Sequence, residues 1–253
     1  MTLAGKHALV TGGGSGIGAA IALSLAQSGA SVTVCGRRRQ PLEATAAGHE
    51  NIHAETADVT DEGSITRLYD HAQAARGKIG IVVANAGMAE SAPAEKTSHA
   101  LWNKTIEINL TGAFLSVKPA LAGMREHGWG RIVFIASTAG LRGYAYVAPY
   151  VAAKHGVVGL SRALALETAK AGITVNAVCP GFTETPLLEQ AVERITATTR
   201  RTVADARTML AANNPLGRFI KPQEVADVVL WLCGDDSAAI TGQAISVSGG
   251  ETW

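Results

Sequence analysis

Short apolar segments alternate with helical segments along almost the whole chain, and this alternation constrains the fold more than any other feature. The apolar segments are rich in β-branched residues or alternate in polarity, as strands do. They span residues 7–11, 31–35, 52–57, 79–84, 131–136, 173–179 and 244–247. Helical patterns such as 17–27 and 150–170 lie between them. The alternation requires right-handed crossovers, so it predicts an α/β fold of the doubly wound Rossmann type, a seven-stranded parallel sheet with helices on both faces.

The length of 253 residues fits one domain built on one such sheet, so we expect a single domain over residues 1–253. One polar, weakly patterned stretch runs from residue 183 to residue 221. Because it is too long for a simple connection, we interpret it as a helical insertion that forms a lid.

The composition excludes several classes of protein. A formal net charge of +1 argues against nucleic acid as a partner. The first residues lack the apolar stretch that a signal peptide needs, and no apolar run approaches 18 residues, so we expect a soluble protein with no membrane partner. Three widely separated cysteines suggest neither a disulfide framework nor a thiolate site, which favours the reducing cytoplasm. The seven histidines show no ligand spacing, so no metal site is expected.

A glycine-rich turn, Thr-Gly-Gly-Gly-Ser-Gly-Ile-Gly over residues 11–18, follows the first strand and opens the first helix. Glycines let the chain approach a pyrophosphate closely, and the helix N-terminus offers free N–H groups and positive dipole charge. The turn therefore predicts a dinucleotide site, with a tight turn that binds no ligand as the alternative. The predicted cofactor-binding residues here are Gly12, Ser15, Gly16, Ile17 and Gly18.

The end of the second strand bears on which dinucleotide is bound. NAD-specific folds commonly place an acidic residue there, but this chain has Arg37, Arg38 and Arg39. Guanidinium groups pair well with a 2′-phosphate, so we predict NADP(H), bound by Arg37 and Arg38, with NAD(H) and a solvated basic turn as alternatives. Asp58 and Val59, after the third strand, are placed to meet the adenine, unless Asp58 simply terminates the strand.

Tyr150 and Lys154 are four residues apart in a helical segment and therefore share one face. A cation about 4 Å away, in an effective dielectric of about 20, favours the phenolate by roughly 4 kcal/mol. Lys154 could thus lower the pKa of Tyr150 from about 10 toward neutrality, before solvent and burial weaken the effect, and make it a general acid or base. Ser137 ends the fifth strand and could hold a substrate oxygen. The alternatives are a chance helical spacing and a turn hydrogen bond of Ser137 to its own backbone.

Together these motifs, with Asn85-Ala86-Gly87, Asn109 and Pro180-Gly181, resemble the short-chain dehydrogenase/reductase family over essentially the whole chain. The resemblance implies a catalytic tetrad, in which Tyr150 is the acid/base and Ser137 orients the carbonyl. Lys154 lowers the Tyr150 pKa and binds the nicotinamide ribose, and Asn109 holds a water in a proton relay. The resemblance also implies further cofactor contacts, from Asn85, Ala86 and Gly87 near the adenosine and from Pro180, Gly181, Thr183 and Thr185 near the nicotinamide and phosphates.

Within this family, the residues after Tyr150 and around Pro180 resemble β-ketoacyl reductases, polyketide ketoreductases and enzymes of 3-hydroxyacyl substrates. The carboxylate-binding histidine of 3-hydroxybutyrate dehydrogenases is replaced by Ala139, which favours a 3-oxoacyl thioester or related ketone. The resemblance supports Arg37 as an NADP(H) signal, but Ser15 stands where some NADP(H) members have a basic residue. An NAD(H)-dependent dehydrogenase of a small hydroxy compound and a non-catalytic dinucleotide-binding sensor are the alternatives. A serine hydrolase is excluded because neither Ser15 nor Ser137 lies in a Gly-x-Ser-x-Gly motif.

Several weaker expectations concern the pocket and the assembly. Candidate pocket walls are Met88, Ala139, Leu141, Tyr144 and Phe182, each of which could equally be ordinary packing. Lid arginines at 194, 200, 201 and 207 could meet phosphates of a carrier or simply solvate a helix. The helix after Tyr150 is apolar on more than one side, and the resemblance implies a homotetramer, so we expect it to pack on another subunit. Trp253 would then pack on a neighbour as well.

Overall fold

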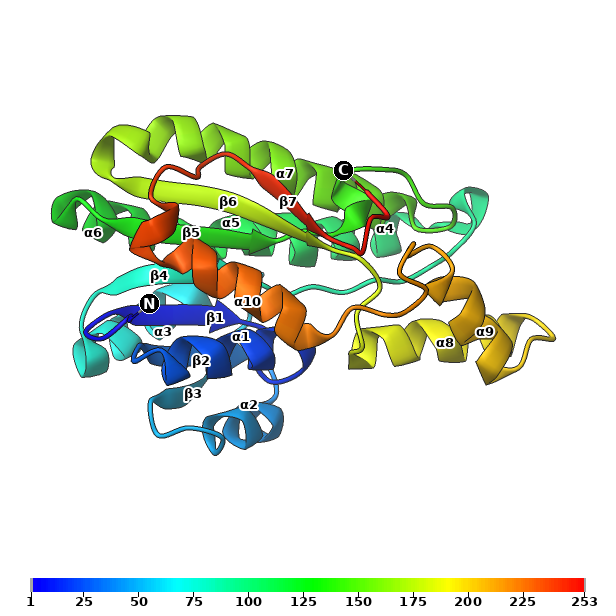
Figure 1. Cartoon of the computed structure of the whole chain (residues 1–253), viewed down its shortest axis with the longest axis horizontal. Helices are drawn as coiled ribbons and strands as arrows, with labels where there is room; N and C mark the ends of the chain where they lie inside the picture. Colours follow the sequence, from blue (N-terminus) through cyan, green and yellow to red (C-terminus); the bar gives the residue numbers. More distant parts are fainter. Residues whose placement is uncertain (1, 253) are drawn as a thin grey trace.

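The computed structural model describes residues 2–252, so the expectation for Trp253 lies outside the described residues. Its core is one sheet in the strand order β3-β2-β1-β4-β5-β6-β7, and every neighbouring pair is parallel (Figure 1). This confirms the predicted seven-stranded, doubly wound sheet. The strands are β1 (His7–Thr11), β2 (Ser31–Gly36), β3 (Ile52–Thr56), β4 (Ile79–Ala84), β5 (Gly130–Ile135), β6 (Ile173–Pro180) and β7 (Ala244–Val247).

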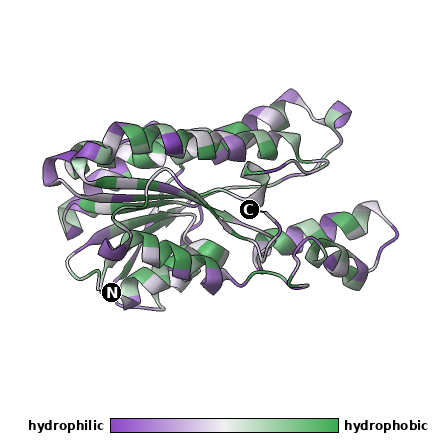
Figure 2. Ribbon diagram, turned by 45° about the horizontal axis from the view of Figure 1, so that its top comes forward, coloured by the Kyte–Doolittle hydropathy of each residue, from purple (hydrophilic) through white to green (hydrophobic). Residues whose placement is uncertain are grey.

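Helices cover both faces of the sheet, as predicted. Successive strand side chains point to opposite faces, so each strand contributes to two separate cores. On one face the core includes residues of α1 (Gly16–Gln27), α2 (Arg39–Ala46) and α10 (Pro222–Cys233). The core on the other face includes residues of α3 (Glu62–Arg76), α5 (Gly112–Val117), α6 (Ala120–His127) and α7 (Ala148–Thr168), and α4 (His99–Ile106) packs against α7. Figure 2 shows the sheet between these two helical layers.

The stretch 183–221 contains two helices, α8 (Pro186–Thr198) and α9 (Val203–Ala211), as its pattern predicts. They project beyond the carboxyl edge of the sheet (Figure 1) and share a small core of their own. That core is made of Leu188, Val192, Ala206, Leu210 and Phe219. Since this core is separate from the two cores of the sheet, α8 and α9 form a unit attached to the sheet at both of its ends.

Element ends differ from the sequence-based ranges by one or two residues. The second strand continues to Gly36 because its ladder with β3 extends to the pair Gly36–Thr56. Helix α7 begins at Ala148, two residues before Tyr150, because Pro149 suits the first turn of a helix. Among residues 2–252, no helix is long and apolar enough to cross a membrane.

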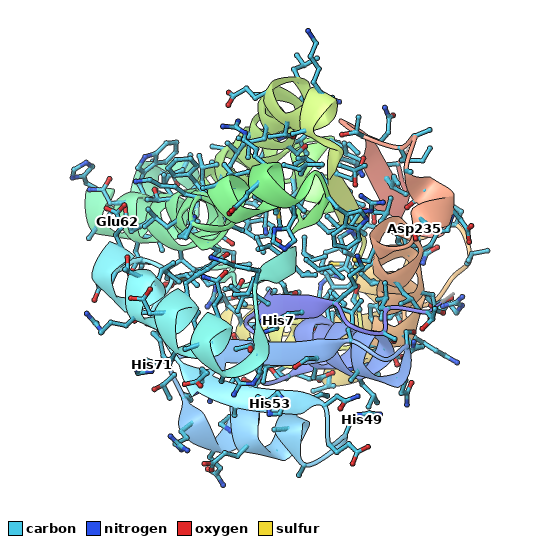
Figure 3. All side chains as sticks on the ribbon, turned by 90° about the vertical axis from the view of Figure 1, so that its left-hand side faces the viewer. His7, His49, His53, Glu62, His71 and Asp235 are labelled. Atoms are coloured by element: carbon cyan, nitrogen blue, oxygen red, sulfur yellow. The ribbon has the colours of Figure 1, made fainter. Side chains whose placement is uncertain are left out.

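His7 is a buried histidine at the amino end of the sheet, on β1, in the view of Figure 3. Its Nδ1 lies 2.8 Å from the Gly77 carbonyl oxygen, and its Nε2 lies 2.9 Å from the Thr33 hydroxyl. Because a carbonyl can only accept, Nδ1 carries the proton. In the neutral imidazole, Nε2 then accepts a hydrogen bond from the Thr33 hydroxyl. Burial lowers the pKa of His7, and the nearby Arg76 and His53 act in the same direction.

We expect His7 to make stability depend on pH. The unfolded chain, in which the His7 pKa is about 6.5, binds the proton first, so the contribution is complete above that pH and is lost as the pH falls below it. Urea unfolding at about pH 7.5 and about pH 5.5 should show a steeper decline of the unfolding free energy for the wild type than for His7→Gln. His71→Gln, on the exposed side of α3, should keep the wild-type slope, and equal slopes in all three proteins would contradict the prediction.

Candidate active site

The segments that carry the predicted site residues leave the sheet at its carboxyl edge. Helix α1 follows β1 onto one face, whereas the helices that follow β4 cover the opposite face. Between these two adjacent strands the winding reverses, and this is the position at which open α/β sheets bind ligands. The fold therefore places the glycine turn at the switch point, between the segments that follow β2 and β4.

The glycine turn is held by the segment after β4. The Asn85 side-chain nitrogen donates to the carbonyl oxygens of Thr11 and Gly12, at 2.9 and 3.2 Å. In return the Thr11 hydroxyl accepts from the backbone nitrogens of Asn85 and Ala86, both at 3.0 Å. Gly12 has a φ of +66° and Gly16 a φ of +54°, values that favour glycine. Asn85 and Thr11 thus hold the glycine turn in shape, and we call this turn, residues 11–18, the nucleotide cradle. Thr11 was not among our predicted binding residues.

The first turn of α1 is open in the way an anion site requires. Ser15 stands at the N-cap, is exposed, and makes no capping hydrogen bond with its side chain, whereas Asp61 caps α3 by accepting from Gly63 and Ser64. A Cβ on Gly18 would overlap the Gly12 carbonyl oxygen, so the turn has no room for a side chain at this position. The turn and the uncapped helix start fit a pyrophosphate, and Ile17 supports them by packing against the core.

The loop after β2 presents two arginines to solvent. Arg39 is used within α2, where it pairs with Glu43 at 2.6 Å, but among residues 2–252 Arg37 and Arg38 form no ion pair. Asp58, after β3, accepts from the Thr60 backbone nitrogen at 3.0 Å and from its hydroxyl at 2.8 Å. The Thr60 backbone bond is the main cause of a lowered Asp58 pKa, to which Arg37 also contributes.

Val59 is buried and packs against Gly112, where an added Cβ would lie 2.7 Å from a Val59 methyl group. Its side chain therefore faces the core, and only its backbone is available to an adenine. Asp58, in contrast, is half-buried.

Ser137, Tyr150 and Lys154 come together at the edge formed by β5 and α7. Lys154 is 4% exposed, and its Nζ donates to the Ile135 carbonyl oxygen at 2.8 Å and lies 5.6 Å from the centre of the Tyr150 ring. Tyr150 and Lys154 share one face of α7, as their spacing predicts. The Ser137 hydroxyl accepts from the Ala139 backbone nitrogen at 3.1 Å, so the alternative turn hydrogen bond exists beside any role in catalysis.

Burial opposes the predicted effect of Lys154 on the Tyr150 pKa. Burial raises the Tyr150 pKa, and the neighbouring Ser137 hydroxyl only partly opposes this effect. Burial also lowers the pKa of Lys154 to about 8. The reason is that a low-dielectric site penalises the charged form of both groups, and the ammonium is bound to Ile135 rather than to the phenol oxygen.

Asn109 lies in a π-helical turn, Glu107–Thr111, between α4 and α5. Its side-chain oxygen accepts from the Met88 nitrogen at 3.2 Å, and its side-chain nitrogen donates to the carbonyl oxygens of Met88 and Thr105, both at 2.9 Å. Asn109 therefore fastens the loop after β4 to the helices through hydrogen bonds to backbone groups. A Cβ on Gly87 would lie 2.8 Å from the Asn109 oxygen and 3.7 Å from Lys154 Nζ, so the two side chains meet beside Gly87.

The loop after β6 reaches the glycine turn. Pro180 is buried, and the Thr183 hydroxyl donates to the Gly181 carbonyl oxygen at 2.9 Å. Thr185 caps α8, and its methyl group would lie 2.9 Å from a Cβ placed on Gly16. The predicted residues of this loop thus stand next to the cradle, although both threonine hydroxyls are engaged within the loop.

The predicted pocket walls and lid arginines have different surroundings. Tyr144 and Phe182 pack edge to face, with ring centres 6.4 Å apart, whereas Ala139 is buried and Leu141 packs against the core. Met88 is half-buried. Of the lid arginines, Arg207 pairs with Glu189 at 2.6 Å, which is a role in the lid itself.

Comparison with known proteins agrees with this geometry. Residues 6–196 match the family model for short chain dehydrogenases. A Streptomyces coelicolor protein assigned as a ketoacyl reductase is 42% identical over 250 residues, covering 96% of this chain and 95% of that protein. The cis-4-hydroxycyclohexanecarboxylate dehydrogenase of Sinomonas cyclohexanicum is 41% identical over 253 residues, covering 98% of this chain and 96% of the enzyme.

Among solved structures, a variant of actinorhodin polyketide ketoreductase crystallised with NADPH superposes with a TM-score of 0.94. It is 41% identical, and the match covers 97% of each chain. The glycine turn, the parallel sheet and these relatives agree over nearly the whole length. The chain therefore belongs to the short-chain dehydrogenase/reductase family, as an NAD(P)-dependent oxidoreductase that acts on CH–OH or carbonyl groups.

Proposed function

We propose that the protein is an NADPH-dependent ketoreductase whose substrate is a 3-oxoacyl thioester or a related ketone. The observation that carries the proposal is the convergence of Ser137, Tyr150 and Lys154 beside the loop that Asn109 fastens. Two similarities support it, since one relative is assigned as a ketoacyl reductase and the superposed polyketide ketoreductase was crystallised with NADPH. Ala139, two residues after Ser137, is buried and carries no charge that could bind the carboxylate of a free acid substrate.

In this proposal, the bound nicotinamide supplies the hydride, and the protein supplies the proton and the orientation. Burial raises the Tyr150 pKa, so the phenol keeps its proton at neutral pH and can donate it to a carbonyl oxygen. The Ser137 hydroxyl holds that oxygen, and Lys154 binds the cofactor ribose as a cation. Asn109 keeps the loop and the π-helical turn in place around a water that returns the proton to Tyr150.

The glycine turn and the loops around it would supply the remaining contacts with the cofactor. The turn formed by Gly12, Ser15, Gly16, Ile17 and Gly18 would hold the pyrophosphate, and Asp58, Val59, Asn85, Ala86 and Gly87 would surround the adenosine side. Pro180, Gly181, Thr183 and Thr185 would close the cradle near the nicotinamide. The supporting observation is that the loop after β6 packs against Gly16.

A ketone panel tests the proposed reaction. Loss of NADPH absorbance would be recorded with acetoacetyl-CoA, a cyclic ketone and free acetoacetate, and we expect the thioester to give the highest kcat/KM. Fastest turnover of a small hydroxy compound with NAD(H) would instead support a dehydrogenase. Cofactor binding without turnover of any compound would support a non-catalytic sensor.

Arg37 should set the preference for NADPH. Because Arg37 has no ion-pair partner within residues 2–252, it is available to a 2′-phosphate, and charge-assisted hydrogen bonds contribute about 1.5–3 kcal/mol. We expect Arg37→Ala to weaken NADPH binding about 10- to 100-fold, and NADH binding little, in fluorescence titrations. Arg39→Ala is the matched control, because Arg39 already pairs with Glu43. Equal losses in both variants, or a wild type that prefers NADH, would contradict the prediction.

Lys154 should limit the reaction at alkaline pH. Its pKa of about 8 means that the ammonium is lost as the pH rises through that value, and with it the cation that binds the ribose. The kcat/KM for NADPH, which reports on the free enzyme, should therefore fall above pH 8. Lys154→Arg, although slower overall, should keep its charge and move the decline to higher pH. A decline at the same pH in both proteins would point to another group.

Three properties beyond the reaction belong to the same proposal. Residues 1–253 would form one domain, in which 183–221 closes over the substrate. The protein would be a homotetramer in the cytoplasm. Exposed apolar side chains that could be shared with another subunit are Leu166 on α7, at 86% exposure, Trp102 on α4, at 41%, and Phe114 on α5, at 38%. The cytoplasm is supported by three cysteines that are all buried and unpaired.

A further inference from the structure

Glu251, in the segment after β7, is an acidic residue in an unexpected place. It is only 7% exposed, although a glutamate is ordinarily found at the surface. The segment 248–252 is fixed at the carboxyl edge of the sheet (Figure 1), where the Ser246 hydroxyl lies 2.7 Å from those of Ser248 and Thr252. Gly249 packs against Asn214, at the end of the lid, so little freedom is left to this segment.

The Glu251 carboxylate is hydrogen-bonded to Tyr144. The Tyr144 hydroxyl contacts one carboxylate oxygen of Glu251 and also lies 2.7 Å from the Thr138 hydroxyl. A phenol has one proton and a carboxylate only accepts, so Tyr144 donates to Glu251, and Thr138 can donate to Tyr144. The chain of hydrogen bonds therefore begins at the residue next to Ser137 and ends in the C-terminal segment.

Tyr144 is also packed on both sides. The Arg142 guanidinium lies over its ring, 5.0 Å from the ring centre, and the Phe182 ring meets it edge to face. Since Tyr144 belongs to the loop between Ser137 and Tyr150, and Phe182 follows Gly181, the ring joins two segments of the candidate site. Fixing the Tyr144 hydroxyl thus fixes the wall on which both segments meet.

The second carboxylate oxygen of Glu251 is buried, lies 3.1 Å from a Cβ placed on Gly181, and has no hydrogen-bond partner among residues 2–252. Burial raises the pKa of Glu251, while the bond from Tyr144 and the nearby Arg142 oppose that shift. A buried carboxylate oxygen without a hydrogen bond lowers the stability of the fold. Such a group is therefore expected to serve a function.

We propose that Glu251 is a positioning residue for substrate recognition, which acts through Tyr144 to hold the 138–147 loop and Phe182 against a bound ketone. The inference rests on the proposed ketoreductase function. It assigns to the C-terminal segment a role in the affinity for the ketone and in the face of the ketone that is presented to the cofactor, with no role in proton transfer.

Steady-state kinetics of three variants test the role. Glu251→Ala and Tyr144→Phe should each raise the KM for the ketone about 10-fold, the effect of losing one hydrogen bond to a charged group, and leave kcat within about threefold. Glu251→Gln keeps an acceptor oxygen and should recover most of the wild-type KM. The double variant should be no worse than either single variant, because both remove the same contact. Asp236→Ala, an exposed acidic residue of the 3₁₀ turn Asp235–Ser237, is the control and should leave KM unchanged.

Two further measurements separate this inference from the proposed function. The ratio of product enantiomers should shift in Glu251→Ala but not in Glu251→Gln. Amide hydrogen exchange over 138–147 should be faster in Glu251→Ala than in the wild type, and this readout requires no turnover. Unchanged exchange and KM would overturn the inference whether or not ketones are reduced. Faster exchange in a protein that reduces no ketone would keep the contact but refute both the ketoreductase function and the substrate role built on it.

Discussion

Tyr150→Phe should lower kcat for ketone reduction by about 10²- to 10⁴-fold, the range in which a positioned general acid contributes. The variant removes one hydroxyl from a half-buried ring, so the packing of α7 and the position of Lys154 should persist. The dissociation constant of NADPH should therefore change by no more than about threefold, because the variant retains the aromatic ring and loses only the proton donor. Single-turnover reduction at saturating NADPH and ketone measures the effect on the chemical step.

Tyr146→Phe provides a matched control for this experiment. Tyr146 lies in the loop before α7, four residues earlier than Tyr150, is 66% exposed, and loses the same hydroxyl on substitution. Its kcat should equal that of the wild type. If Tyr150→Phe retained most of the activity, a different proton donor would be required, and the proposed role of Tyr150 would be wrong.

Gly18→Ala should be the most damaging single-methyl change in the nucleotide cradle. The new Cβ would overlap the Gly12 carbonyl oxygen and lie 2.5 Å from the Asn85 side-chain nitrogen, well inside contact distance. Neither neighbour can yield freely, because Asn85 is bonded to both Thr11 and Gly12. We expect a loss of about 1–3 kcal/mol in the free energy of unfolding, typical of overpacking, and NADPH binding weakened at least about 10-fold.

Gly123→Ala is the control for the added methyl group. Gly123 lies within α6, and a Cβ there meets only the Lys78 side chain, at 3.9 Å. Alanine in a helix interior should leave NADPH binding unchanged and raise stability by about 0.5–1 kcal/mol. Urea unfolding and NADPH titration of both variants decide the question, and an unaltered cofactor affinity in Gly18→Ala would show that the turn does not touch the pyrophosphate.

Tyr150 and Lys154 show what a correct residue spacing leaves open. The four-residue spacing predicts that the two side chains share a face of α7, and they do. It carries no information on burial, and burial raises the Tyr150 pKa and lowers that of Lys154 to about 8. Desolvation disfavours the charged form of both groups, and the Lys154 ammonium donates to the Ile135 carbonyl oxygen.

Asn85 could be predicted from the sequence in part, and the role of Glu251 could not be predicted from it. Asn85 was expected near the cofactor from its motif, but its bonds to Thr11 and Gly12 join residues more than 70 positions apart and could not be derived from local pattern. Glu251 had no signal in the sequence, since a glutamate is ordinarily a solvated surface charge. Its bond to Tyr144 spans 107 positions and exists only because β7 ends beside β6.

Periodicity and short spacings were enough to predict the parallel sheet, the glycine turn at the first crossover and the shared face of Tyr150 and Lys154. The hydrogen bonds between Thr11 and Asn85 and the buried bond between Glu251 and Tyr144 became evident only from the folded chain. Hydrogen bonding and desolvation depend on which distant segments meet, and the order in which the strands assemble determines which segments those are.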